Sequence, residues 1–131
     1  MEQYEDLISE ARRAIGKCFL ANPNTIRRYG AAVKTKKGAI YSAGQYSSFN
    51  HITSIHAEMA AVILATMSED SEIIACAVAI KDNVSKAKSC GICLQFLKEH
   101  AERTGNDIDM IYIGRDDIKI YKLSDLVKDL W

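Results

Sequence analysis

The sequence predicts an α/β fold in which helices and strands follow in the order α-β-β-α-β-α-β-β-α. Three observations support this prediction. The run Ile73–Ile80 is apolar without interruption, as in a strand covered on both faces of a sheet. Apolar residues recur at helical spacing before and after this run. Only residues 114–117 separate the last two strand-like segments, too few for a crossover helix, so these strands should pair antiparallel.

The first half of the chain should begin with an amphipathic helix from Tyr4 to Phe19, with Cys18 buried in its apolar stripe. Asn22–Asn24, with a proline at its centre, should end this helix. Two short strands follow, Gly30–Lys34 and Ala39–Ser42. The lysines and glycine between them favour a hairpin.

The second half starts with a polar, irregular segment, residues 44–54, which could line a pocket. Residues 55–67 then form a helix that is apolar nearly all round, so both of its faces should be covered, one by the sheet and one by another protein layer. The remaining expected elements are a helix from Cys90 to about Arg103, strands at Ile108–Ile113 and Ile118–Tyr121, and a short helix capped by Ser124.

The composition describes one globular domain, residues 1–131, with 48% hydrophobic and 26% charged residues. The 17 basic and 17 acidic residues cancel, which argues against a nucleic-acid-binding protein. No apolar run approaches the roughly 20 residues that span a bilayer, so no membrane association is expected. The acidic N-terminal region is unlike a targeting presequence, and without a secretory signal the four cysteines suit metal binding better than disulfides. We therefore expect a cytoplasmic protein.

Four residues in two short motifs carry the chemistry. His56 and Glu58 open the apolar helix, and Cys90 and Cys93 open the next one. At a helix start each pair can converge on one ion. His56, Cys90 and Cys93 are therefore predicted to bind Zn²⁺, and three protein ligands leave one position open for water. Glu58 is predicted to be the catalytic acid and base, moving protons between that water and a substrate.

Two other interpretations of these residues stay open, and both describe a non-enzymatic protein. A structural zinc site would need a fourth ligand, but the spare histidines, His51 and His100, lack ligand-like spacing. A redox dithiol is typical of a C-x-x-C motif at a helix start, but it leaves His56 and Glu58 without a role.

The motifs His56-Ala57-Glu58 and Cys90-Gly91-Ile92-Cys93 together resemble the H-x-E…P-C-x-x-C signature of the zinc nucleobase deaminases. Gly91 and Gln95 make the sequence similar to the small one-domain cytidine deaminases and their blasticidin S deaminase relatives. The two final strands without an intervening helix separate it from the tRNA adenosine and deoxycytidylate deaminases. The resemblance covers most of the chain and includes Arg28–Val33, Gly38 and Tyr121–Leu126.

This resemblance implies a three-layer α-β-α sandwich around a five-stranded mixed sheet. It also implies hydrolytic deamination of a cytosine nucleoside, cytidine or deoxycytidine, to the uracil product and ammonia. Glu58 would protonate the ring nitrogen and later pass a proton to the departing ammonia, and the Ala57 backbone N–H would contact the base carbonyl. The expected partners are a small nucleoside-like substrate and further copies of the chain, as a homotetramer or a dimer.

The sequence departs from the family pattern near the sugar. The family's Asn-x-Glu pair, which holds the ribose hydroxyls, corresponds to Gln45 and Ser47, or to Tyr46 and Ser48 in the neighbouring register. Losing that carboxylate should weaken nucleoside binding by about 1.5–3 kcal/mol if no other group replaces it. The family's upstream Phe corresponds to Arg27. We expect Gln45, Ser47 and Arg27 to bind the substrate, which could instead be a modified cytosine nucleoside, a nucleotide or another aminated heterocycle such as blasticidin S.

Three further departures lie at the metal-binding motifs. Ser89 stands where the family has Pro, Leu94 where it has Arg, and Met59 where three-cysteine members have Arg. A site with two thiolates is neutral with Zn²⁺, so it has less need of that second arginine.

Overall fold

The computed structural model describes residues 2–24, 27–81 and 89–128. Its main sheet has the strands β2 (Arg28–Thr35), β3 (Ile40–Gly44), β5 (Ile73–Lys81), β6 (Asp109–Ile113) and β7 (Ile118–Lys122). The helices are α1 (Glu5–Ala14), α2 (Ala57–Met67), α3 (Gly91–Thr104) and α4 (Leu123–Val127).

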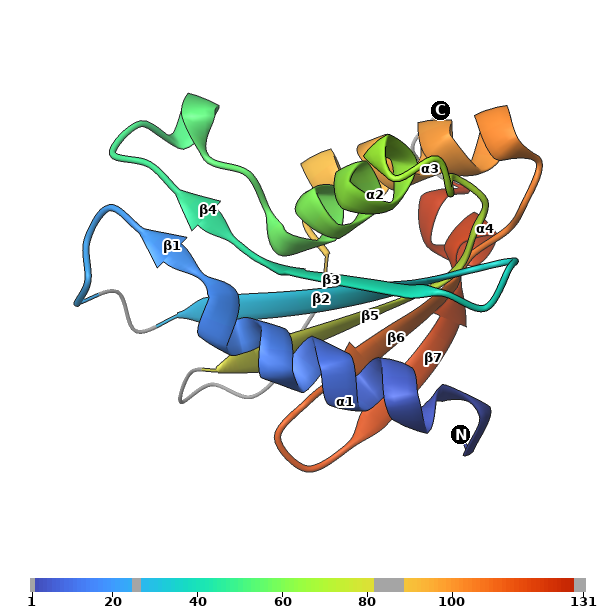
Figure 1. The fold of residues 1–131 in the computed structure, drawn as a ribbon, viewed down its shortest axis with the longest axis horizontal. Helices are drawn as coiled ribbons and strands as arrows, with labels where there is room; N and C mark the ends of the chain where they lie inside the picture. The colour runs from blue at the N-terminus through green and yellow to red at the C-terminus, as the bar shows by residue number, and fades with distance from the viewer. Residues whose placement is uncertain (1, 25–26, 82–88, 129–131) are drawn as a thin grey trace.

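The five strands form a mixed sheet in the order β3-β2-β5-β6-β7. β5 and β6 are parallel, and the other neighbours are antiparallel. α1 covers one face of the sheet, and α2 and α3 lie side by side on the other (Figure 1). The predicted three-layer sandwich around a five-stranded mixed sheet is confirmed.

β5 is the central strand, as its apolar sequence predicts. Its side chains alternate between two cores, because successive residues of a strand point to opposite faces. Cys76 and Val78 pack in the core beneath α2 and α3, and the alanines at 75, 77 and 79 pack beneath α1. Cys76 is fully buried, as expected of a structural cysteine.

α1 and the turn that follows it pack so closely on the sheet that two glycines are required beneath them. A Cβ atom on Gly30 would lie 2.3 Å from the carbonyl oxygen of Ala11. A Cβ atom on Gly44 would lie 2.5 Å from the backbone nitrogen of Cys18. These are backbone contacts, which cannot move aside as a flexible side chain could.

The first helix is shorter than predicted. α1 ends at Ala14, and a 3-10 turn, Ile15–Lys17, leads to Cys18, where the backbone becomes extended (φ −63°, ψ 137°). Gly16 favours this early end because glycine is a poor helix former. Cys18 is therefore only partly buried, and its Sγ donates a hydrogen bond to the Tyr29 carbonyl (3.2 Å).

A second, two-stranded sheet was not predicted. β1 (Phe19–Leu20) pairs in parallel with β4 (Tyr46–Ser47), beside the main sheet (Figure 1). Phe19, expected in the apolar stripe of the first helix, is 62% exposed and stacks on Tyr46, with ring centroids 5.0 Å apart. Two-residue strands are too short to produce a recognisable alternating pattern.

α2 is covered on one side only by the described chain. Ala57, Ala61 and Ala65 are fully buried, whereas Ile63, Leu64 and Met67 are 40%, 45% and 74% exposed. The prediction that both faces are covered is therefore wrong for a single chain. The reason is that α3 lies beside α2 in the same layer and does not cover its outer face (Figure 1).

Ser124 does not cap the last helix, contrary to the prediction. α4 begins at Leu123, so Ser124 lies inside its first turn. The Asp107 carboxylate reaches this turn from outside and accepts hydrogen bonds from the Ser124 N–H (3.1 Å) and hydroxyl (2.7 Å).

The other element predictions agree with the structure. β2 and β3 form the expected hairpin, and β6 and β7 the expected antiparallel pair. α3 ends at Thr104, and Gly105 follows in the left-handed conformation (φ 74°), a common way to end a helix. None of the described helices is long and apolar enough to cross a membrane.

Candidate functional site

The start of α2 brings His56 and Glu58 to the same cavity. His56 is the N-cap residue of α2 with an extended backbone (φ −73°, ψ 153°), and Glu58 lies in the first turn. In mid-helix, residues two apart would point to different sides. The change of backbone conformation at His56 removes this difficulty, and both residues line one cavity, as the sequence predicted.

The start of α3 presents two thiols in the same manner. Cys90 is its N-cap residue, and Cys93 lies in its first turn. The His56 Nδ1 atom lies 3.1 Å from the Cys93 Sγ and 3.2 Å from the Cys90 Sγ. The three atoms all lie within 4.8 Å of one another, and both cysteines are free. The positive ends of two helix dipoles meet here, which favours negatively charged ligands.

This donor set could hold one metal ion. Tetrahedral zinc, with bonds of about 2.0 Å to nitrogen and 2.3 Å to sulfur, separates its ligand atoms by roughly 3.5–3.8 Å. Burial raises the pKa of the Cys93 thiol well above its usual value, and the nearby Glu58 carboxylate raises it further. A thiolate at Cys93 therefore depends on a bound cation.

The group has three members among the described residues, so one coordination position would remain for a small ligand. His100, one of the spare histidines, is engaged elsewhere, because its Nε2 lies 2.6 Å from the Ser71 carbonyl oxygen. The side chain of His51 lies outside the described part of the chain. A closed four-ligand structural site is therefore not formed by the described residues.

Glu58 is buried, with 3% of its surface exposed. Its Oε2 atom accepts a hydrogen bond from the Ser89 hydroxyl (2.8 Å), which in turn accepts one from the Tyr112 hydroxyl (3.0 Å). Burial raises the pKa of Tyr112 to about 12, so its hydroxyl stays protonated at neutral pH and can donate. Ser89 and Tyr112 were not assigned to the site from the sequence. Serine in place of the family's proline was a signal for the first, and nothing marked the second.

An open cavity of about 430 Å³ reaches His56, Glu58 and Cys90. Small-molecule sites typically enclose about 300–1,000 Å³, so this cavity has the size of such a site. Glu58 supplies the one carboxylate among the described lining residues. The cavity is lined by Ala21, Asn22, Tyr29, Gln45, Ser47, Ser48, Phe49, Ser54, Ile55, His56, Ala57, Glu58 and Cys90.

The residues predicted to bind the substrate lie in different environments. Gln45 and Ser47 line the cavity, as does Ala57, but Arg27 is exposed outside its lining. The Gln45 amide is engaged by its own chain: Oε1 accepts the Tyr29 N–H (2.8 Å), and Nε2 donates to the Ser47 Oγ (3.0 Å) and the Arg27 carbonyl (3.4 Å). Ser47 accepts from Gln45, so its own hydroxyl hydrogen can reach a ligand.

The polar segment 44–54 lines the cavity, as its composition suggested, and beyond Gln45 and Ser47 it contributes Ser48, Phe49 and Ser54, for which no role was assigned. Ser48 and Ser54 are linked by a hydrogen bond from the Ser48 N–H to the Ser54 Oγ (2.9 Å). Phe49 is 92% exposed at the cavity's edge. Serine-rich composition was the available signal for this wall, and it does not say which hydroxyls face inward.

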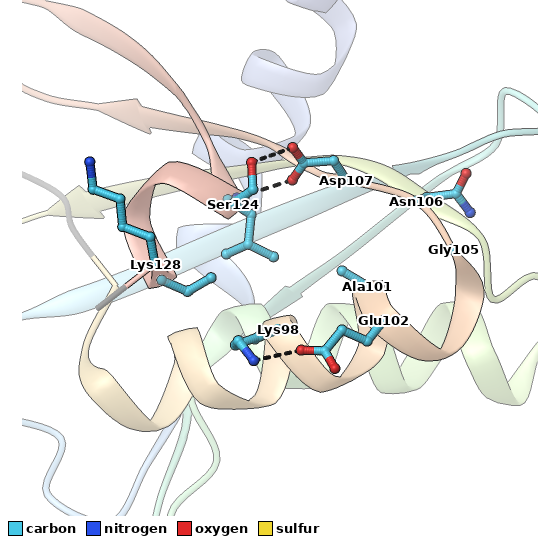
Figure 2. A pocket seen from close by; sticks show the side chains of 10 residues that line it. Lys98, Ala101, Glu102, Gly105, Asn106, Asp107, Ser124 and Lys128 are labelled. Atoms are coloured by element: carbon cyan, nitrogen blue, oxygen red, sulfur yellow. Dashed lines mark hydrogen bonds and ion pairs between the residues drawn. The ribbon is translucent and has the colours of Figure 1, made fainter. Parts of the chain in front are cut away.

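A second cavity, of about 370 Å³, lies between the C-terminal half of α3 and α4 (Figure 2). Four of its polar side chains bind one another in two pairs. Lys98 forms an ion pair with Glu102 (2.6 Å), and Asp107 accepts the two hydrogen bonds from Ser124 (Figure 2). Nothing in it resembles the converging ligands at the start of α3.

Comparison with solved structures identifies the fold. The structure of cytidine deaminase from Burkholderia pseudomallei matches 96% of this chain and 97% of its own, with a TM-score of 0.82 and 22% sequence identity. The chain has the cytidine deaminase fold. The cytidine deaminase from Mycobacterium tuberculosis matches with a TM-score of 0.75 and 21% identity over 96% of this chain and 94% of its own. That from Bacillus anthracis matches with a TM-score of 0.70 and 19% identity over 98% and 89%. No protein-family model and no curated protein matches the sequence.

Proposed function

We propose that this protein is a zinc-dependent hydrolase that deaminates a cytosine nucleoside, with cytidine or deoxycytidine as the first candidates. The observation that supports this most is the meeting of three metal-ligand atoms with a buried carboxylate at the end of one nucleoside-sized cavity. The cytidine deaminase fold adds to the argument, since the solved relatives are named for that activity.

His56, Cys90 and Cys93 would hold the zinc ion, and the bound ion would supply an activated water molecule at the floor of the cavity. The reaction exchanges one bond for another: water oxygen bonds to C4 of the base, the C4–N bond breaks, and ammonia leaves. Two protons must move during this exchange, one to the ring nitrogen and one to the departing amine.

Glu58 is suited to carry both protons. It lies in the same cavity as two of the ligands and is almost completely shielded from bulk water. A positioned acid and base of this kind typically contributes about 10²–10⁴-fold to a rate. The Ala57 N–H belongs to the first turn of α2, whose amides have no acceptor within the helix. It would donate to the carbonyl oxygen of the base and so orient C4.

The outer part of the cavity would hold the group attached to the base. Ser47 can donate to a hydroxyl there, whereas Gln45 would act mainly by holding Ser47 in place. Arg27, exposed outside the lining, would contact only a substituent that extends beyond the cavity. Because this part of the lining offers no carboxylate for a ribose diol, a modified nucleoside, a nucleotide or an aminated heterocycle such as blasticidin S is a second candidate substrate.

A homo-oligomer, a tetramer or a dimer, belongs to the same proposal. The outer face of α2 leaves Ile63, Leu64 and Met67 exposed side by side on a helix, as expected of a surface that packs against another chain. Light scattering of the purified protein measures the assembly directly, and a monomer at working concentration would contradict this part of the proposal.

The deciding experiment combines zinc analysis with ammonia release. We expect one zinc per chain and turnover of at least one member of a panel of cytidine, deoxycytidine, cytidine monophosphate, cytosine and blasticidin S. Glu58→Gln should retain zinc and lose kcat by about 10²–10⁴-fold, because the amide cannot carry a proton. Zinc binding without ammonia from any compound would point to the structural or redox alternative, and full activity of Glu58→Gln would remove the proton-carrier role.

A further inference from the structure

Three side chains from separate parts of the chain form a continuous series of hydrogen bonds that ends on the predicted catalytic carboxylate. Tyr112, in β6, donates to the Ser89 Oγ (3.0 Å). Ser89, directly before the N-cap residue of α3, donates to the Glu58 Oε2 (2.8 Å) in α2. A carboxylate can only accept, and a serine hydroxyl has one hydrogen, so the bond to Glu58 leaves Ser89 able to accept from Tyr112. The donors and acceptors therefore match in one direction along the whole chain.

We propose that Ser89, supported by Tyr112, is a positioning residue that sets the orientation of the Glu58 carboxylate for proton transfer. This inference rests on the proposed function, because Glu58 needs a fixed orientation only if it moves protons. It concerns this chain in particular. The deaminase signature that the sequence resembles has a proline at this position, and proline has no hydroxyl to donate.

The orientation matters because a carboxylate can turn about its Cγ–Cδ bond. Terminal torsions of this kind have broad energy wells, so packing alone holds them weakly. A bond from Ser89 to one oxygen selects one plane and therefore one direction for the other oxygen. Proton transfer requires donor and acceptor atoms within about 2.6–3.2 Å, so a carboxylate that turns freely spends less time in reach of the substrate.

Tyr112 keeps the Ser89 hydroxyl turned toward Glu58. The tyrosine is itself held, with 8% of its surface exposed and its ring tilted against that of Tyr121 at a centroid distance of 6.0 Å. Its raised pKa, caused by burial, ensures that it remains a donor across the pH range in which the protein would work. The Ser89 oxygen accepts the hydrogen bond from Tyr112. Its own hydrogen therefore forms its most favourable hydrogen bond when it points at Glu58.

The test measures kcat and KM separately on zinc-loaded protein, with cytidine or whichever panel compound the wild type deaminates. Ser89→Ala should lower kcat by about 10-fold or more, the usual effect of losing a hydrogen bond to a charged group, while KM changes less than about twofold. Ser89→Thr keeps the hydroxyl and should restore most of kcat. Ser68→Ala, at the far end of α2, is the matched control.

A double-mutant cycle separates positioning from simple packing. Tyr112→Phe should lower kcat less than Ser89→Ala does, and the double variant should be no slower than Ser89→Ala, because Tyr112 acts through Ser89. Tyr121→Phe is the control for the aromatic hydroxyl. Zinc content and melting temperature are measured for each variant. A purely structural role would change these two quantities and would not produce the non-additive losses in kcat.

The possible results distinguish this inference from the proposed function. If the wild type releases ammonia and Ser89→Ala has the same kcat, or if the two changes are additive, the positioning role is wrong and the proposed function stands. If the zinc-loaded wild type releases no ammonia from any panel compound, the proposed function is wrong and the positioning role is lost with it.

Discussion

The two ends of α3 border two cavities that differ in how their polar groups are used. At the N-terminal end, Cys90 and Cys93 converge with His56 on one point, where a single cation would satisfy all three. At the C-terminal end, Lys98 bonds with Glu102, and Asp107 holds the first turn of α4 (Figure 2).

The difference shows how to recognise a candidate functional site when two hollows are of similar size. Charged groups that bind each other stabilise the fold and have little left to offer a ligand. Ligand atoms that crowd together without a counter-charge, beside a buried carboxylate, lower stability unless something binds between them. Cavity volume alone does not separate the two places, since they enclose about 430 and 370 Å³.

The largest effect is expected when a candidate metal ligand is removed at the N-terminal end of α3. Cys93→Ser should abolish stoichiometric zinc binding and lower activity by more than about 100-fold, because even the loss of a partner that only orients a ligand costs about 10–100-fold. Elemental analysis and ammonia release measure the two effects. Cys18→Ser, which changes a cysteine away from the metal group, should keep both; equal zinc content in the two variants would contradict the ligand assignment.

A smaller effect is expected from the polar contact at the other end. Asp107→Ala removes the acceptor of two Ser124 hydrogen bonds and should lower the free energy of unfolding by about 1 kcal/mol, with zinc content and kcat unchanged. Denaturant unfolding at neutral pH measures this, with Asp117→Ala as the control. A loss of zinc in the Asp107 variant would show that the two ends are not independent.

The same contact predicts a dependence on pH. Burial opposes ionisation of Asp107, but hydrogen bonds from Ser124 and the Ile108 N–H outweigh it and lower the pKa of this carboxyl. A lowered pKa in the folded state stabilises the protein above the unfolded-state value of about 4. The stability difference between wild type and Asp107→Ala should therefore be constant from neutral pH down to about 5 and shrink below 4. A difference that grows on acidification would contradict the assignment.

The smallest expected effect comes from the ion pair at the edge of the second cavity. Glu102→Gln should change the free energy of unfolding by less than about 0.5 kcal/mol, because Glu102 is 61% exposed and helix pairs of this spacing contribute little. Denaturant unfolding in low and high salt checks this. A large, salt-sensitive loss of unfolding free energy would contradict this expectation and would mean that the pair is part of a larger network of charged side chains.

Much of the candidate site could be predicted because its residues come in local pairs. His56 with Glu58 and Cys90 with Cys93 are each close in sequence, and each pair acts through the start of its own helix. Gln45 shows where such reasoning stops. Its position suggested a substrate contact, but its amide binds Tyr29 and Ser47. The register of the β2–β3 hairpin, in which Gly44 pairs with Gly30, brings Gln45 beside Tyr29, and the local sequence does not give that register.

The sequence by itself determined the order of the main helices and strands, the central strand β5 and the two helix starts that carry the candidate metal ligands. These follow from periodicity and spacing, which depend only on residues that are close together in the sequence. The tertiary structure decided that the first helix ends before Cys18, that Asp107 and not Ser124 stabilises the start of α4, that one face of α2 stays exposed, and that Tyr112 and Ser89 reach Glu58. Each of these depends on which distant segments the sheet order brings into contact, and no local pattern encodes that.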